Sequence, residues 1–161
     1  LWGVESGTQR ILDVLDKGTC VGDIENVLRD SHEAGIWNVV FMIIQSPTQR
    51  KEEIEQDIAF LQKNSNIIFT VTGSSFRLEV GSRMYRHPER FGIKVKEHDD
   101  PFTPVRYYED SGGVSAEESD LLFKKYNVEF VMLSRVSWYF GKMRDHMLLF
   151  ADHLSKDPLR T

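Results

Sequence analysis

The segment IWNVVFMII, residues 36–44, limits the possible folds of this chain more than any other stretch. It is almost continuously apolar and rich in β-branched side chains, which is the pattern of a strand buried on both faces in a parallel sheet. Parallel strands are joined by crossover connections, and these usually contain a helix. The segment therefore predicts an α/β fold if helices and further strands flank it.

The flanking sequence supplies these elements in alternation. Leu1 to Val4 has the character of a strand end, and residues 66–73 (NIIFTVTG) predict a third strand. Apolar residues at helical spacing predict a helix that ends near Gly18, a second helix over residues 19–35, and a third between the second and third strands. This order is the βαβ signature of a parallel α/β sheet. Three strands are too few for a closed barrel, so the sheet is open, completed by another part, or extended by the rest of this chain.

The regularity drops after Gly73, where turn signals and mixed basic and aromatic residues follow. Ser115 and Glu118 then form a capping-box pattern, and the apolar content beyond them predicts helices. We therefore expect two parts: residues 1–94 with the parallel strands, and residues 95–161 as a mainly helical C-terminal extension.

Charge and composition exclude several classes of partner and site. The net charge is −5 and the basic residues are scattered, so no nucleic-acid partner is expected. No apolar run approaches the roughly 18 residues of a membrane span, so no membrane partner is expected either. The one cysteine, Cys20, excludes an internal disulfide and fits a reducing, cytoplasmic location. The histidines show no metal-ligand spacing, so no metal site is predicted.

Four short motifs follow one another near the start of the chain: Gly3–Gly7 (GVESG), Gln9–Leu12 (QRIL), Lys17–Thr19 (KGT) and Ala34–Ile36 (AGI). In this order and spacing they resemble the second half of a radical S-adenosylmethionine (radical SAM) core, most closely that of cobalamin-associated, Fe–S oxidoreductase-like enzymes. The later stretch FRLEVGSRMYRHPERFGI adds to the likeness, which covers about residues 1–94.

This resemblance implies a partial TIM-like barrel of six βα units, of which this chain would hold the fourth to sixth strands. It implies SAM as cofactor and a 4Fe-4S cluster held by a Cys-x-x-x-Cys-x-x-Cys loop in the N-terminal half. One cysteine cannot supply such a loop. The chain starts with Leu1 and not Met, so we expect it to be part of a longer protein whose N-terminal half is its partner.

The resemblance also implies a function for the intact protein. A reduced cluster would cleave SAM, and the resulting radical would abstract hydrogen from an unidentified small-molecule substrate, or cobalamin in a separate domain would mediate methyl transfer. This chain would contribute SAM ribose and carboxylate contacts and substrate-side structure, and would be inactive alone.

Three candidate contacts to SAM come from the first and third motifs. Glu5 and Ser6 match positions at the end of the family's fourth strand, where side chains bind the ribose and amino-acid moieties of SAM, and a carboxylate suits ribose hydroxyls. The alternative is that the pair caps the following helix. Lys17 matches a position that reaches the SAM carboxylate, and its alternative is a solvated partner of a helix C-terminus.

The turn QSPTQR, residues 45–50, stands where the family has Gly-x-Pro-Gly-Glu-Thr. Pro47 persists, Gln45 and Thr48 replace the two glycines, and Gln49 replaces the glutamate. Glycine permits close backbone approach to a ligand, so this turn departs from the pattern at the positions that matter most. The backbone at Gln45 remains a candidate contact to the methionyl or adenosine part of SAM.

Other chemistry-bearing residues have simpler alternatives. The apolar side chains of the second strand either border an adenine or form sheet core: Val40, Met42 and Ile44. His87, in the basic loop 83–90, is either an acid–base group or solvated surface. The aromatic pairs and triplets at Tyr107–Tyr108 and Trp138–Phe140 favour packing over substrate stacking.

Two rival functions stay open. A half barrel exposes strand edges and apolar helix faces, so the chain could be a non-catalytic α/β interaction module or degenerate half barrel that binds no SAM and assembles with a partner or a second copy. A small complete α/β enzyme with Glu5 as general base is a third reading, without a companion His or Lys at a known spacing.

Overall fold

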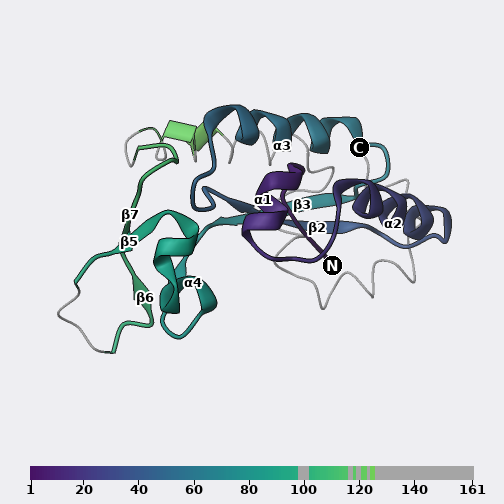
Figure 1. Cartoon of the computed structure of the whole chain (residues 1–161). Coiled ribbons are helices and arrows are strands. Elements are labelled where there is room, and N and C mark those ends of the chain that lie inside the picture. The colour runs from purple at the N-terminus through teal and green to yellow at the C-terminus, as the bar shows by residue number, and fades with distance from the viewer. Residues whose placement is uncertain (98–101, 116–117, 119–120, 123, 126–161) are drawn as a thin grey trace.

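A three-stranded parallel sheet in the order β1-β2-β3 forms the centre of the computed structural model (Figure 1), which describes residues 1–97, 102–115, 118, 121–122 and 124–125. The strands are β1 (Trp2–Glu5), β2 (Val39–Ile44) and β3 (Thr70–Ser75). Val40 lies opposite Trp2 on one side and Val71 on the other. The predicted α/β class with a parallel sheet is confirmed.

Three helices accompany the sheet: α1 (Gln9–Val14), α2 (Val21–Glu33) and α3 (Lys51–Lys63). Side chains of α2, α3 and one face of the sheet form a single apolar cluster, whose members include Leu28, Ile54, Val40 and Met42. Along β2, buried and half-buried residues alternate. The strand is therefore fully covered on one face only, not on both as its continuous apolar sequence predicted.

Two glycines lie near helix ends, and one of them marks the end itself. The second helix ends at Glu33, and Gly35 follows with φ +82°, the left-handed conformation that suits glycine after a helix. The first helix ends earlier than predicted, at Val14, and Gly18 lies in the loop beyond it with φ +64°. Three residues thus connect the helix end to Gly18, and Lys17 is one of them.

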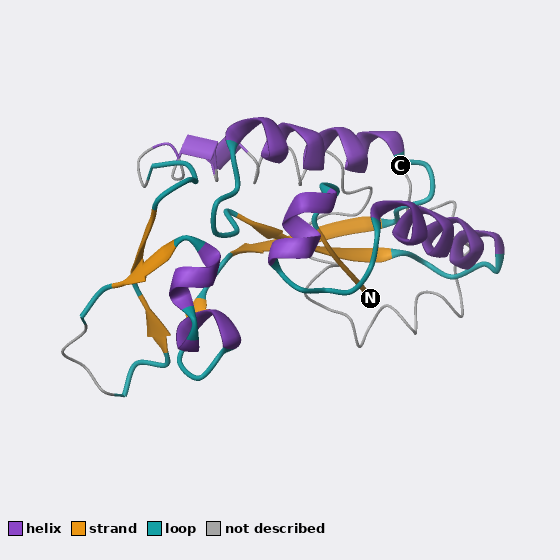
Figure 2. Cartoon of the chain, viewed as in Figure 1, coloured by secondary structure: helices purple, strands orange, loops and turns teal. Residues whose placement is uncertain are grey.

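A smaller unit follows β3, built from β4 (Leu78–Glu79), α4 (Arg83–Arg86), the 3-10 helix η1 (Pro88–Phe91), β5 (Ile93–Val95), β6 (Val105–Arg106) and β7 (Tyr108–Asp110). Antiparallel pairs β4–β6 and β5–β7 hold it together around a core of Leu78, Met84 and Ile93. Figure 2 shows this unit beyond the carboxyl ends of β2 and β3.

The smaller unit spans the predicted division between residues 94 and 95, because β5 precedes this point and its partner β7 follows it. The capping box beyond it is confirmed: Glu118 N donates to Ser115 Oγ, and Ser115 N donates to Glu118 Oε2, both at 3.2 Å. Residues 121–122 and 124–125 are helical, and residues 126–161, which include Trp138–Phe140, lie outside the described residues.

Candidate functional site

The carboxyl ends of β1 and β2 carry an unusual backbone. Glu5, Gln45 and Thr48 have φ values of 65°, 61° and 62°. A left-handed conformation costs an L-residue about 1–2 kcal/mol, and such strain gathers at functional sites. Gln45 and Thr48 are the residues that replace the two glycines of the family pattern. The turn therefore has the backbone conformation that glycine favours, with other residues at these positions.

Two irregularities of the local backbone set the direction of the Glu5 side chain. Gly3 lies opposite Phe41, but Glu5 lies opposite Met42, so a bulge at this point shifts the register. Bulges redirect side chains at strand ends. Ser6 N donates to Val4 O at 2.8 Å, which closes a three-residue turn with Glu5 at its centre. The Glu5 carboxylate lies back over Gly3, because a Cβ on that glycine would stand 2.8 Å from Glu5 Oε1.

The two carboxylate oxygens of Glu5 have different environments. Lys17 Nζ donates to Oε1 at 2.9 Å. Oε2 is buried and has no hydrogen-bond partner among the described residues. The Glu5 side chain is only 10% exposed. A buried acceptor left unpaired is costly, so Oε2 points to a ligand that donates a hydrogen bond, such as a hydroxyl or an ammonium group.

Ser6 belongs to a buried polar cluster around Asp57 of α3. Ser6 Oγ donates to Asp57 Oδ1 at 2.6 Å, and it accepts from Thr8 N at 3.0 Å. Gly7 N also donates to Asp57 Oδ1, at 2.7 Å, and Gln49 Nε2 donates to Asp57 Oδ2 at 2.8 Å. The capping alternative differs from this arrangement, because the N-cap of α1 is Thr8 and its side chain makes no cap hydrogen bond.

Burial raises the pKa of Asp57 to about 6, against the lowering effect of the hydrogen bonds that its carboxylate accepts. These bonds come from two loops, the one between β1 and α1 and the one between β2 and α3. Asp57 thus connects both strand ends to the same helix. Gln49 stands where the radical SAM pattern has a glutamate, and in this chain its amide donates to the carboxylate of Asp57.

A second polar cluster lies around Arg10 of α1. Arg10 Nε donates to Glu53 Oε1 at 2.5 Å, and Arg10 Nη2 donates to Thr48 O at 2.7 Å. Arg10 holds the pKa of Glu53 below its usual value. Asp110 of β7 accepts from Thr48 N at 2.6 Å. The turn after β2 is therefore fixed from both sides, by α1 and by the smaller unit.

The structure brings Glu5, Ser6 and Gln45 to one edge of the sheet, and it brings Lys17 to Glu5. The pairing of Lys17 with Glu5 was not expected, because the resemblance implied that the two residues contact different groups of SAM. Gln45 is half-buried directly after β2. Their roles as cofactor contacts stay predictions.

Where the structure describes the other candidates, their contacts agree with the simpler alternatives. The alternating side chains Val40, Met42 and Ile44 lie in the core cluster beneath the helices, as the core reading predicts. His87 is half-exposed, with Nδ1 4.0 Å from Glu89 Oε1, as expected for solvated surface. Tyr108 packs edge-to-face on Phe76, with ring centroids 5.9 Å apart.

Sequence reasoning missed Asp57, although a signal was present. The third helix was predicted from Ile54, Ile58 and Leu61, and position 57 falls on the same face of a helix as these three. An acidic residue inside an apolar stripe is buried and needs donors from elsewhere. Asp110 gave no such signal, because its partner Thr48 lies 62 residues earlier.

Neither the described residues nor the comparisons with known proteins assign a function to the chain. The described residues contain no group of His, Cys, Asp and Glu side chains that could hold a metal ion. Within that part of the chain, no helix has the length and apolar character needed to cross a bilayer. The chain matches no protein-family model, and comparison with curated proteins gives no match either.

Proposed function

We propose that this chain is the C-terminal half of a radical SAM core, with its three strands as half of a partial TIM-like barrel, and that Glu5 binds SAM. Support comes from the parallel order β1-β2-β3 and from the position of the candidate residues at strand carboxyl ends, where α/β barrels place their sites. The single observation that carries the proposal is the buried Oε2 of Glu5, which has no partner among the described residues.

The residues at this edge fit the polar groups of SAM. Glu5 Oε2 can accept from a ribose hydroxyl or from the ammonium group, while Oε1 stays paired with Lys17. Lys17 is about one-third exposed and can turn its remaining N–H groups to a carboxylate. The hydroxyl of Ser6 is already engaged by Asp57 and Thr8, so Ser6 contributes through its position next to Glu5.

When bound, SAM supplies one-electron and methyl-transfer chemistry that protein side chains lack. The residues of this chain do not fit the 4Fe-4S cluster that this chemistry needs, because the sequence has one cysteine and a cluster needs three or four thiolates. In this proposal the cluster belongs to the N-terminal half of the same protein, and cobalamin, if used, to a further domain. The substrate stays an unidentified small molecule, and the cytoplasmic location stays a prediction.

Calorimetric titration of the chain with SAM tests this proposal. We expect wild type to bind, and Glu5→Gln to weaken binding about 10- to 100-fold, as expected for a lost charged hydrogen bond worth about 1.5–3 kcal/mol. Glu25→Gln is a matched control, because it breaks another Glu–Lys pair, with Lys63 at 2.8 Å on the surface. Absence of binding by wild type, or equal affinities of wild type and Glu5→Gln, contradicts the proposal.

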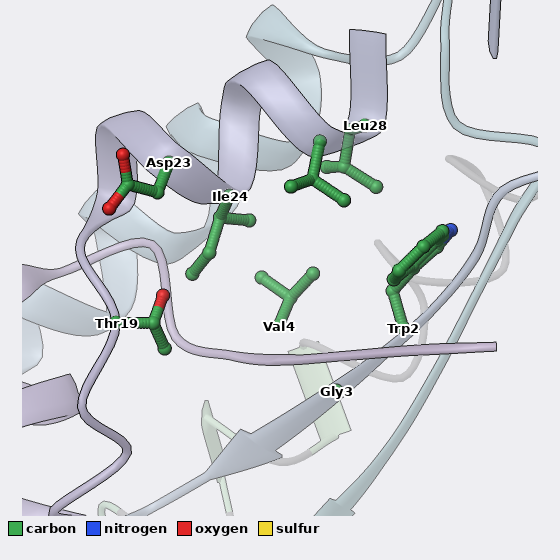
Figure 3. A pocket seen from close by; sticks show the side chains of 8 residues that line it. Trp2, Gly3, Val4, Thr19, Asp23, Ile24 and Leu28 are labelled. Carbon is green, nitrogen blue, oxygen red and sulfur yellow. The ribbon is translucent and has the colours of Figure 1, made fainter. Parts of the chain in front are cut away.

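A second candidate function is the interaction module, and a specific surface favours it. A hollow of about 340 Å³ lies between β1 and α2, lined mainly by apolar residues that include Trp2, Val4, Ile24 and Leu28 (Figure 3). In the described sheet, β1 pairs only with β2, so its other edge offers free backbone groups beside this hollow. Val27 on the rim is 42% exposed.

The oligomeric state distinguishes this candidate. If the surface joins two copies, native mass spectrometry at rising concentration will show a homodimer, and Val27→Asp will return it to the monomer. If instead it receives the N-terminal half, the chain alone stays monomeric and binds that half only when Val27 is intact. A chain that stays monomeric and whose binding to that half is unaffected by Val27→Asp excludes this surface.

A further inference from the structure

The left-handed conformation of Glu5 must be maintained by contacts on either side of it. A three-residue turn with positive φ at its centre is the rarer, strained form of its class. Strained residues persist only where surrounding contacts determine their geometry. On the N-terminal side β1 is fixed by pairing with β2. On the C-terminal side the next two residues, Ser6 and Gly7, both donate to Asp57.

We propose that Asp57 is a positioning residue, which holds the Glu5 carboxylate over Gly3 and against Lys17 in the form that binds ligand. Its Oδ1 accepts from Ser6 Oγ and Gly7 N directly after Glu5, and its Oδ2 accepts from Gln49 in the turn after β2. One carboxylate thereby fixes both strand ends relative to each other. This inference rests on the proposed function for the identity of the ligand, but not for the position of Glu5.

An exchange of the acid at position 57 with the amide at position 49 separates this role from a general effect on stability. Gln49 Oε1 accepts from Ser46 N at 3.0 Å, so its Nε2 must face Asp57. In Asp57→Asn, an amide N–H must face another donor, either Gln49 Nε2 or the Ser6–Gly7 pair. In the double variant Gln49→Glu/Asp57→Asn, the new glutamate accepts from both Ser46 N and the Asn amide, so Ser46, Ser6 and Gly7 keep an acceptor and no two donors face each other.

The position of Glu5 is read without ligand, from the ¹³C shift of its carboxyl carbon and the shift of the Lys17 ammonium group. The Glu5 signal is assigned with Glu5→Gln. We expect both shifts to move in Asp57→Asn and to return in the double variant, and SAM affinity to fall about tenfold and then recover in the same order. Glu55→Gln, an equal charge change on the exposed face of α3, should leave all of them at wild-type values.

Unchanged Glu5 and Lys17 shifts in a folded Asp57→Asn protein would overturn the proposal, as would a folded double variant whose shifts stay displaced. If Asp57→Asn does not fold, Ser6→Ala removes one of the contacts, and the same displacement of the Glu5 and Lys17 shifts is then expected; wild-type shifts in Ser6→Ala count against the role. Failure of wild type to bind SAM, with these shifts behaving as expected, contradicts the proposed function and leaves the positioning role intact.

Discussion

The position of the Glu5 carboxylate depends on the absence of a side chain at Gly3. Because glycine has no Cβ, the carboxylate can lie across the strand at a place where a methyl group would stand 2.8 Å from Oε1. The bulge in β1 and the positive φ of Glu5 bring the side chain to this place. At the residue scale, the candidate site is therefore a set of small backbone adjustments around one acid.

Gly3→Ala tests this arrangement. We expect the new methyl group to push Glu5 away from Lys17, weaken SAM binding at least tenfold, and destabilise the chain by about 1–3 kcal/mol, the usual cost of overpacking. Calorimetry and urea unfolding measure the two effects.

Gly22→Ala is the control for this substitution. Gly22 lies in α2 with nothing within 4 Å of an added Cβ. Alanine is the better helix former, so this variant should gain about 1 kcal/mol and bind SAM as wild type does. If Gly3→Ala behaves like Gly22→Ala, the Glu5 carboxylate does not need the space over Gly3.

Asp57 should give the stability of the chain a distinctive pH dependence. Its pKa rises from 3.8 to about 6 on folding, so the folded chain binds more protons between these values. The protonated carboxyl stabilises the folded chain fully below about pH 4, and this stabilisation is lost as pH rises through about 6. It amounts to about 3 kcal/mol, because the pKa of Asp57 is about two higher in the folded chain than in the unfolded chain. Glu53, whose pKa is lowered, acts in the opposite direction as pH falls.

The difference between wild type and Asp57→Asn isolates this group, because the other acids are common to both. Urea unfolding from pH 4 to 7 should show wild type losing stability relative to the variant across the window from about pH 4 to 6. A constant difference across that window would show that the pKa of Asp57 is not raised in the folded chain.

Between elements, one buried amide connects both outer strands and α2. Asn38, directly before β2, accepts from Trp2 Nε1 at 2.8 Å and from Ser31 Oγ at 2.6 Å. Its Nδ2 donates to Leu28 O at 2.6 Å and to Ile67 O at 3.0 Å. The amide thus satisfies groups of β1, the end of α2 and the segment before β3 at the amino end of the sheet.

Asn38→Ala should therefore destabilise the chain strongly. It leaves four hydrogen-bonding groups without this partner in a fully buried place, and we expect a loss of about 2–4 kcal/mol in urea unfolding. Asn26→Ala, on the exposed surface of the same region, should stay within about 0.5 kcal/mol of wild type. Equal effects of the two substitutions would contradict the importance of the buried amide.

For the whole molecule, the sheet and the smaller unit meet at the turn after β2. Asp110 accepts from Thr48 N, and its other oxygen accepts from Gly112 N and Gly113 N at 2.9 and 3.0 Å. Gly92 lies against Thr48 on the same side, since a Cβ there would stand 3.0 Å from Thr48 Cγ2. The smaller unit thus helps to keep Thr48 in its left-handed conformation.

Asp110→Ala should loosen this junction. We expect faster hydrogen exchange at Thr48 N and a loss of stability of about 1–3 kcal/mol, because three backbone donors lose their acceptor. Glu109→Ala is the neighbouring control, since Glu109 is exposed and pairs only loosely with Lys96, at 3.6 Å. Unchanged exchange at Thr48 in Asp110→Ala would mean that the junction does not depend on this carboxylate.

Local patterns in the sequence determined the elements and their order. Residues 36–44 predicted a strand, and the apolar spacing of Ile54, Ile58 and Leu61 predicted α3, because periodicity depends on neighbours along the chain. The same reasoning placed Glu5 and Gln45 at strand ends. It could not show that Gln45 and Thr48 adopt a left-handed backbone, since neither residue favours it.

Only the tertiary structure decided what the side chains at this edge contact. Lys17 meets Glu5 across a loop, Ser6 meets Asp57 from 51 residues away, and Asp110 meets Thr48 from 62 residues away. Contacts at such separations depend on how the crossovers return the chain to the sheet, which periodicity does not encode. The sequence by itself determined the parallel α/β sheet and the residues at its carboxyl edge. The packing of α3 and of the smaller unit decided which of those residues hold one another and which oxygen of Glu5 stays without a partner among the described residues.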